Sequence, residues 1–187
     1  MKTDIIEQFE LFCTFDVIVP KDYAHDTCLE AFHKKYRKEL FYYHESLTDI
    51  NFRKVTTKLT SGQKFKVKVF RLRNESESFE SLSCLAFLKT QHAVLVGAQG
   101  AALAYEQGRR VLPKRSWISS YDVKDALYKD ADGYHLVPSL IFYDVNDYSS
   151  ELVWPRFSVG VFEYSKHPGS CILCFSPVRS EPNIDAT

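Results

Sequence analysis

The segment from Lys64 to Leu72 constrains the fold more than any other part of this sequence, because charged and apolar residues alternate along its length. A period of two is typical of a β-strand with one buried face. The residues expected on the core face are Phe65, Val67, Val69 and Arg71, and those on the opposite face are Lys64, Lys66, Lys68 and Phe70. The segment therefore predicts a sheet with one core face and one wet, cationic face.

Further strands and helices follow from the same periodicities and from the turn residues between them. The other expected strands are Leu11 to Val19, Phe41 to Tyr43, Ala93 to Val96, Trp117 to Tyr121, Tyr134 to Tyr143, Leu152 to Tyr164 and Cys171 to Ser176. The expected helices are Asp26 to Glu39, Ser46 to Lys58, one that ends near Thr90, one from Ala101 to Gly108 and a short one that begins at Asp122. Thr27 and Glu30 have the spacing of a capping box for the first of these helices, and Gly108 is expected to end the fourth as a left-handed cap.

This order of elements predicts an α+β fold, with a mixed, largely antiparallel sheet packed by about four helices and finished by a C-terminal β-hairpin or meander. A purely parallel sheet is the alternative. The length of 187 residues suits one globular domain, which we expect to span residues 1–176. Residues 177–187 are polar and lack apolar periodicity, so we expect a flexible C-terminal tail there.

The charge balance limits the kinds of partner. Lys plus Arg and Asp plus Glu both number 24, so the formal net charge is zero. No overall field attracts phosphate backbones or anionic membranes, which disfavours a dedicated nucleic-acid binder. A local basic face, formed by Lys64, Lys66 and Lys68, keeps nucleic-acid interaction open as a second alternative.

The cysteines and the apolar segments indicate a cytoplasmic protein. The five cysteines are an odd number in a chain with no signal segment, which favours reduced thiols, and no stretch is long and apolar enough to span a membrane. Cys171 and Cys174 have a Cys-x-x-Cys spacing, but residues three apart on a strand point to opposite faces. We therefore expect buried core cysteines, no metal site and no cofactor.

The sharpest local motif is an apolar strand followed by Gly97-Ala98-Gln99-Gly100 and a helix. A glycine loop at the amino end of a helix can bind an anion, because backbone N–H groups and the helix dipole point at it. The spacing matches neither a phosphate-binding P-loop nor a dinucleotide fingerprint, so tight packing of the helix on the sheet is the favoured interpretation. Arg109 and Arg110 would assist a phosphorylated ligand if the loop binds one.

Other polar residues are candidates for acid–base or nucleophilic chemistry. His25 and Asp26 precede the first helix, and Asp130, Asp132 and His135 lie near a turn, where Asp and His commonly cap or initiate local structure. Cys84 lies on a helix among apolar neighbours, and its base would have to come from His92 or His135 in other elements. These residues form no complete catalytic motif.

One resemblance adds to this interpretation. The segments that carry it are Cys84-Leu85-Ala86-Phe87-Leu88-Lys89, Ala93 to Ala101, Asp132-Gly133-Tyr134-His135 and Cys171-Ile172-Leu173-Cys174-Phe175. In these segments the chain resembles a group of short, uncharacterised bacterial proteins. The resemblance implies a bacterial or bacteriophage origin, and it implies no activity, cofactor or catalytic residue.

We expect a non-catalytic binding or protein-interaction module, whose partner is another protein or a small anionic ligand. The aromatic residues expected to be exposed for such contacts are Tyr42, Tyr43, Tyr148 and Trp154. The first alternative is a small enzyme or sensor that binds a phosphorylated small molecule at Gly97 to Gly100.

Overall fold

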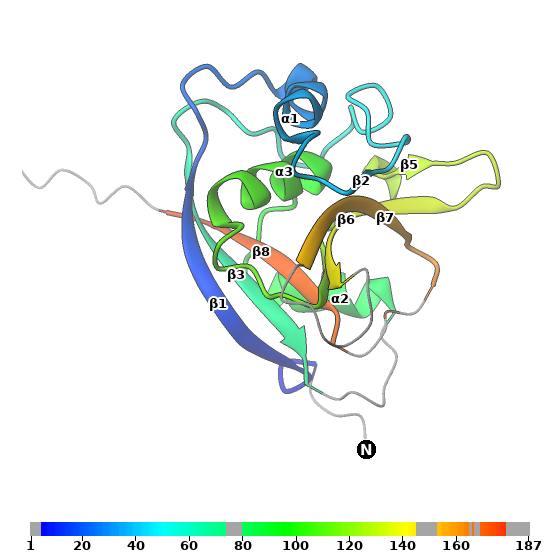
Figure 1. The fold of residues 1–187 in the computed structure, drawn as a ribbon. Helices are drawn as coiled ribbons and strands as arrows, with labels where there is room; N and C mark the ends of the chain where they lie inside the picture. The colour runs from blue at the N-terminus through cyan, green and yellow to red at the C-terminus, as the bar shows by residue number, and fades with distance from the viewer. Residues whose placement is uncertain (1–4, 74–79, 145–152, 165, 167–168, 179–187) are drawn as a thin grey trace, which may run out of the picture.

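The computed structural model describes residues 5–73, 80–144, 153–164, 166 and 169–178 (Figure 1). The strands are β1 (Phe9–Ile18), β2 (Tyr42–Tyr43), β3 (Lys64–Leu72), β4 (Ser116–Ser119), β5 (Tyr128–Lys129), β6 (His135–Asp144), β7 (Val153–Val161) and β8 (Cys171–Pro177). The α-helices are α1 (Cys28–Tyr36), α2 (Ser81–Thr90) and α3 (Gly97–Gly108), and the 3-10 helices are η1 (His25–Thr27) and η2 (Lys124–Ala126).

All eight strands belong to one sheet, in the order β1-β3-β8-β4-β6-β7-β2, with β5 beside β6. The β4–β8 and β2–β7 pairs are parallel, and the other pairs are antiparallel. The predicted mixed, largely antiparallel sheet is therefore confirmed. The predicted number of about four helices is wrong, because the described residues contain three α-helices and two single 3-10 turns.

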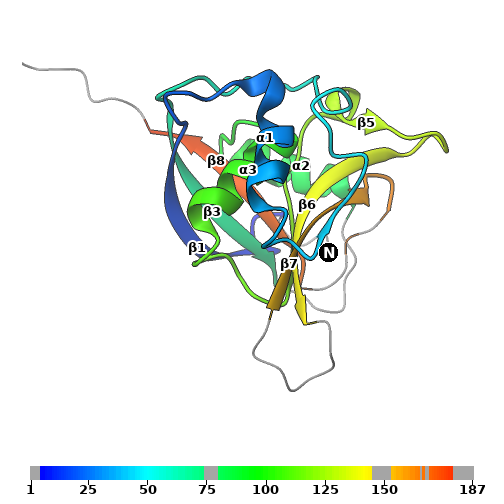
Figure 2. The same cartoon turned by 45° about the horizontal axis from the view of Figure 1, so that its top comes forward.

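The sheet separates two cores. The larger core joins α1 and α3 to residues such as Val67, Leu140 and Leu173, and the smaller core joins α2 to Phe70 and Ile172 on the opposite face. Figure 1 shows the sheet curving around α3, and Figure 2 shows α1 lying over α3. The order of layers is therefore α1, α3, sheet and α2.

The alternation in β3 produces the predicted faces with one correction. Phe65, Val67 and Val69 are buried in the larger core, and Lys64 and Lys66 are exposed on the other face. Phe70, however, is buried by α2. The second face is therefore wet and cationic only where α2 does not cover it.

The C-terminal strands pair differently from the expectation of a simple hairpin or meander. β6 and β7 do pair with each other in antiparallel fashion. β8, however, lies between β3 and β4 and not beside β7. The two cysteines of β8 are buried, as predicted: Cys171 lies in the larger core and Cys174 in the smaller core.

Two predicted elements do not form. Residues 46–58 contain turns rather than a helix, because the side chain of Asp49 points inward and binds the start of α1. Residues 93–96 form a single bridge, between Val94 and Phe175, rather than a strand. Their apolar side chains still pack against both cores, although only Val96 is fully buried.

The helix ends also differ from the sequence rules. Thr27 makes no side-chain cap hydrogen bond to α1, so the predicted capping box is wrong. Gly108 is helical rather than left-handed, and a Cβ atom there would lie 2.3 Å from Phe15 Cε2. This glycine therefore lets α3 approach β1 closely.

None of the helices among the described residues combines the length and the apolar character needed to cross a membrane.

Candidate functional site

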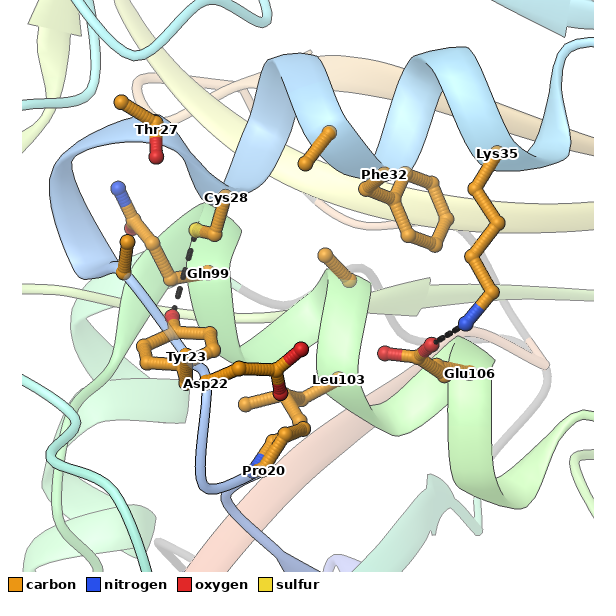
Figure 3. A pocket seen from close by; sticks show the side chains of 13 residues that line it. Pro20, Asp22, Tyr23, Thr27, Cys28, Phe32, Lys35, Gln99, Leu103 and Glu106 are labelled. Atoms are coloured by element: carbon orange, nitrogen blue, oxygen red, sulfur yellow. Dashed lines mark hydrogen bonds and ion pairs between the residues drawn. The ribbon is translucent and has the colours of Figure 1, made fainter.

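A cavity of about 350 Å³ lies between α1 and α3 and is closed on a third side by the segment that follows β1 (Figure 3). The residues that line it are Pro20, Asp22, Tyr23, Ala24, Thr27, Cys28, Ala31, Phe32, Lys35, Gln99, Ala102, Leu103 and Glu106. Its floor is buried and largely apolar, since Phe32, Ala102 and Leu103 are 5%, 5% and 2% exposed. Its rim, which includes Ala31 and Asp22, is exposed.

Each helix contributes a regular stripe to this cavity. The α1 residues are Cys28, Ala31, Phe32 and Lys35, and the α3 residues are Gln99, Ala102, Leu103 and Glu106. Both sets have the spacing i, i+3, i+4, i+7, which places four side chains on one face of a helix. The second position of each stripe is alanine, and these small side chains leave open the space between the helices.

A polar group of side chains occupies one end of the cavity. The hydroxyl of Tyr23 donates a hydrogen bond to Cys28 Sγ over 3.3 Å. Gln99 lies at the same end (Figure 3) and donates from Nε2 to Phe52 O over 2.8 Å. Gln99 is 1% exposed, and its Oε1 has no hydrogen-bond partner within the described part of the chain. This end therefore holds one buried acceptor that is not satisfied.

The thiol of Cys28 is not set up as a nucleophile. Burial raises its pKa to about 12, although the hydrogen bond from Tyr23 acts in the opposite direction. A thiol with this pKa is protonated near neutral pH, whereas reactive cysteines are thiolates stabilised by nearby positive charge. The raised pKa therefore disfavours covalent attack by this thiol.

An ion pair closes the opposite end of the cavity. Lys35 on α1 pairs with Glu106 on α3, and the hydroxyl of Tyr36 donates to the same carboxylate over 3.3 Å. Figure 3 shows Asp22 between the two ends. The lining therefore has two carboxylates and one ammonium group, a formal charge of −1. This charge disfavours a phosphorylated occupant.

The wall formed by α1 is fixed by residues from the loop that follows it. Asp49 accepts hydrogen bonds from Leu29 N over 2.9 Å and from Glu30 N over 3.0 Å. These are two of the backbone donors that the first turn of a helix leaves without internal partners. The hydroxyl of Tyr43 donates to Leu47 O over 2.8 Å, so the loop is in turn held in place.

The predicted glycine loop is the buried first turn of α3. A Cβ atom on Gly100 would lie 2.2 Å from Val96 Cγ2, and one on Gly97, whose φ is 51°, would lie 3.3 Å from Asp122 Oδ2. The space at the start of α3 thus contains a carboxylate of the protein itself, which Thr56 N and Val123 N also bind. Burial raises the pKa of Asp122 above its ordinary value. These contacts favour the packing interpretation, and of the four loop residues only Gln99 lines the cavity.

Arg109 and Arg110 lie beyond the other end of α3. At about 1.5 Å per residue, the helix separates them from Gly97 by roughly 18 Å. Arg109 lies over the ring of Tyr36, with 5.3 Å between its guanidinium carbon and the ring centroid. Its Nε lies 3.8 Å from Glu39 Oε2. Neither arginine is near the start of the helix.

The residues predicted for interaction are spread over the sheet. Tyr42 is 44% exposed on β2 at one edge, whereas Tyr43 is half-buried and stacks on His33. Lys64, Lys66 and Lys68 share one face of β3, where Lys66 pairs with Asp16 over 3.3 Å. Tyr148 and the side chain of Trp154 lie outside the described residues.

Four of the predicted acid–base candidates, His25, Asp26, Asp130 and His135, have structural partners. His25 Nδ1 accepts a hydrogen bond from Leu59 N over 3.3 Å, and Asp26 pairs with Lys58 over 2.9 Å. Asp130 accepts from Tyr134 N in a turn, and His135 Nδ1 lies 2.7 Å from Glu163 Oε1. The other members of this set, Cys84, His92 and Asp132, contribute no side chain to the cavity.

Sequence reasoning missed most of the cavity, including Asp22, Tyr23, Cys28, Lys35 and Glu106. One sequence signal could have found the two helical walls. Both helices carry four lining residues at the spacing i, i+3, i+4, i+7, and the second of the four is alanine in each, Ala31 in α1 and Ala102 in α3.

Comparison of the chain with protein-family models, with curated proteins and with solved structures finds no match.

Proposed function

We propose that this protein is a non-catalytic binding domain that holds a small, uncharged, largely apolar molecule in the cavity between α1 and α3. The observation that carries the proposal is the pair of facing helical stripes, whose alanines Ala31 and Ala102 leave about 350 Å³ open above a buried floor. Ligand pockets commonly measure about 300–1,000 Å³ and combine apolar walls with a few placed polar groups.

The polar groups indicate which kind of molecule fits. Gln99 supplies a buried acceptor that lacks a donor among the described residues, and a buried polar group without a partner is destabilising. The oxygen itself is buried, so a ligand with one N–H or O–H group next to an apolar body would satisfy this acceptor after a rotation of the Gln99 amide toward the cavity. Phe32 and Leu103 would contact the apolar body, and the carboxylates of Asp22 and Glu106 would disfavour an anion.

Binding is favoured over catalysis by the state of the thiol. Cys28 is the strongest potential nucleophile in the lining, and burial raises its pKa to about 12. His25 accepts a backbone hydrogen bond at Nδ1, which puts the proton of the neutral ring on Nε2, and its side chain does not line the cavity. A catalytic cysteine requires such a base or another means of lowering its pKa.

A thermal-shift screen with uncharged aromatic and aliphatic fragments tests the proposal, with the best fragment then measured by calorimetry. The decisive comparison uses two exposed alanines on helices: Ala31→Leu fills the cavity, and Ala86→Leu changes α2 on the other side of the sheet. We expect Ala31→Leu to weaken binding by about tenfold or more and Ala86→Leu to leave it unchanged, since loss of fit in an apolar pocket changes affinity by this order. Equal affinity in both variants would exclude the cavity as the binding site.

A further inference from the structure

A second hollow, of about 300 Å³, lies near the amino end of β1, whereas the cavity between α1 and α3 lies beyond the carboxyl end of that strand. Its lining consists of Glu10, Arg71, Leu72, Arg73, Lys114, Arg115 and Gly169. Three separate parts of the chain meet there: the β1–β3 pair, the segment before β4 and the segment before β8. Figure 1 shows these ends of the strands at the bottom of the molecule, away from α1.

The lining of this hollow is strongly cationic. Arg71, Arg73, Lys114 and Arg115 face one carboxylate, Glu10, which gives a formal charge of +3. None of the ion pairs between described residues involves any of these five side chains. The whole chain is electrically neutral, so this local excess is a property of the site and not of the composition. Like charges held close together repel one another, and a bound anion would relieve that repulsion.

One of the cations is held in place by the fold, and another lies on unusual backbone. Arg71 is half-buried, its guanidinium carbon lies 4.5 Å from the ring centroid of Phe12, and its buried Nε has no hydrogen-bond partner within the described part of the chain. Arg115 has a φ of 56°, a left-handed conformation that residues other than glycine seldom adopt. Strained backbone of this kind is enriched at functional sites.

We propose that this hollow binds the phosphate group of a small molecule. A guanidinium group presents a planar set of N–H donors that matches two oxygens of a phosphate, and three arginines line the hollow. The dimensions suit one or two phosphate groups with part of an attached molecule. The site shares no residue with the cavity between α1 and α3, so it does not depend on the function proposed for that cavity.

The test is a titration with inorganic phosphate and with pyrophosphate, at constant ionic strength, monitored by calorimetry and by amide NMR. Arg73 and Arg115 are exposed, so the double variant Arg73→Gln, Arg115→Asn removes two charges without opening the core, and asparagine tolerates the left-handed backbone. Arg110→Gln is the matched control, because Arg110 is an exposed cation outside the hollow. We expect the double variant to bind pyrophosphate at least about tenfold more weakly, as loss of hydrogen bonds to a charged group predicts, and the control to bind like the unchanged protein.

Three results would overturn the proposal. The first is the absence of any saturable binding of phosphate or pyrophosphate by the unchanged protein. The second is retention of affinity in the double variant, or an equal loss in Arg110→Gln. The third is binding of a short single-stranded oligonucleotide through the same residues with no binding of pyrophosphate, since that would make the surface a nucleic-acid interface.

Discussion

Replacing Asp49 with alanine tests whether the wall of the cavity formed by α1 depends on this side chain. Asp49 is 7% exposed and binds two backbone donors in the first turn of α1, at 2.9 and 3.0 Å. The Leu29 N–H is buried, so water cannot replace the lost carboxylate there, whereas the Glu30 N–H is only partly buried and can be hydrated. Most of the decrease in stability therefore comes from the Leu29 N–H, which is left without a hydrogen-bond partner.

The expected decrease in the free energy of unfolding is about 2–3 kcal/mol. A buried donor without a partner costs about 1–3 kcal/mol, and loss of a helix cap typically costs about 1 kcal/mol. In a chain of this length, a change of 1 kcal/mol moves the melting temperature by about 2–4 °C, so we expect a decrease of roughly 4–12 °C. Asp49→Asn keeps one acceptor oxygen and should lose about 1 kcal/mol or less.

Urea denaturation followed by circular dichroism measures these changes. Asp26→Ala is the control, because Asp26 precedes the same helix but pairs with Lys58 on the surface, where ion pairs contribute little. If Asp49→Ala unfolds at the same urea concentration as Asp26→Ala, the hydrogen bonds of Asp49 do not stabilise the start of α1.

Three further predictions concern packing, titration and reactivity. Gly108→Ala should lower the free energy of unfolding by about 1–3 kcal/mol in urea denaturation, because the added Cβ would overlap the ring of Phe15; an unchanged midpoint would contradict this. Burial lowers the pKa of His25 below its ordinary value of 6.5, so the unfolded chain takes up a proton at a pH where the folded chain does not. The free energy of unfolding should therefore fall as the pH drops through about 6.5, and it should level off below the pKa of His25 in the folded protein. His25→Asn, which keeps an acceptor for Leu59 N, should flatten this part of the curve of urea midpoint against pH; a persisting slope would assign the effect to another group. Alkylation of Cys28 by iodoacetamide near neutral pH, measured by mass spectrometry, should be much slower in the folded protein than in urea, and rapid labelling of the folded protein would reopen a catalytic role.

The parts of the fold that follow from local pattern were predictable from the sequence. The alternation in β3 and the apolar periodicity of α1 reflect neighbours only a few residues away, and both elements formed, although α1 is shorter than the expected helix from Asp26 to Glu39. Residues 46–58 also have some helical periodicity, but Asp49 makes its contacts with α1, about 20 residues earlier in the chain. A tertiary hydrogen bond outweighed a weak local preference there.

The order of the strands and the cavity depend on contacts between distant residues. Consecutive strands usually pair, so the sequence favoured β8 beside β7, and nothing local shows that it inserts between β3 and β4. The cavity could not be predicted for the same reason, because it depends on residues far apart in the chain, such as Lys35 and Glu106, which are 71 positions apart. Each stripe can be read from the sequence, but the fact that the two stripes face each other cannot. The sequence offers Gln99 only as a contact in the alternative anion site at Gly97 to Gly100, whereas the structure places it in the lining of the cavity.

The most direct test of the account is amide NMR of the protein titrated with an uncharged apolar fragment found by thermal shift. The proposed function predicts that the signals of Cys28, Ala102 and Leu103 move with one binding constant, which Ala31→Leu weakens by about tenfold or more and Ala86→Leu leaves unchanged. Changes that map to other surfaces, or an unchanged binding constant in Ala31→Leu, would contradict the claim that the space between α1 and α3 is a binding site.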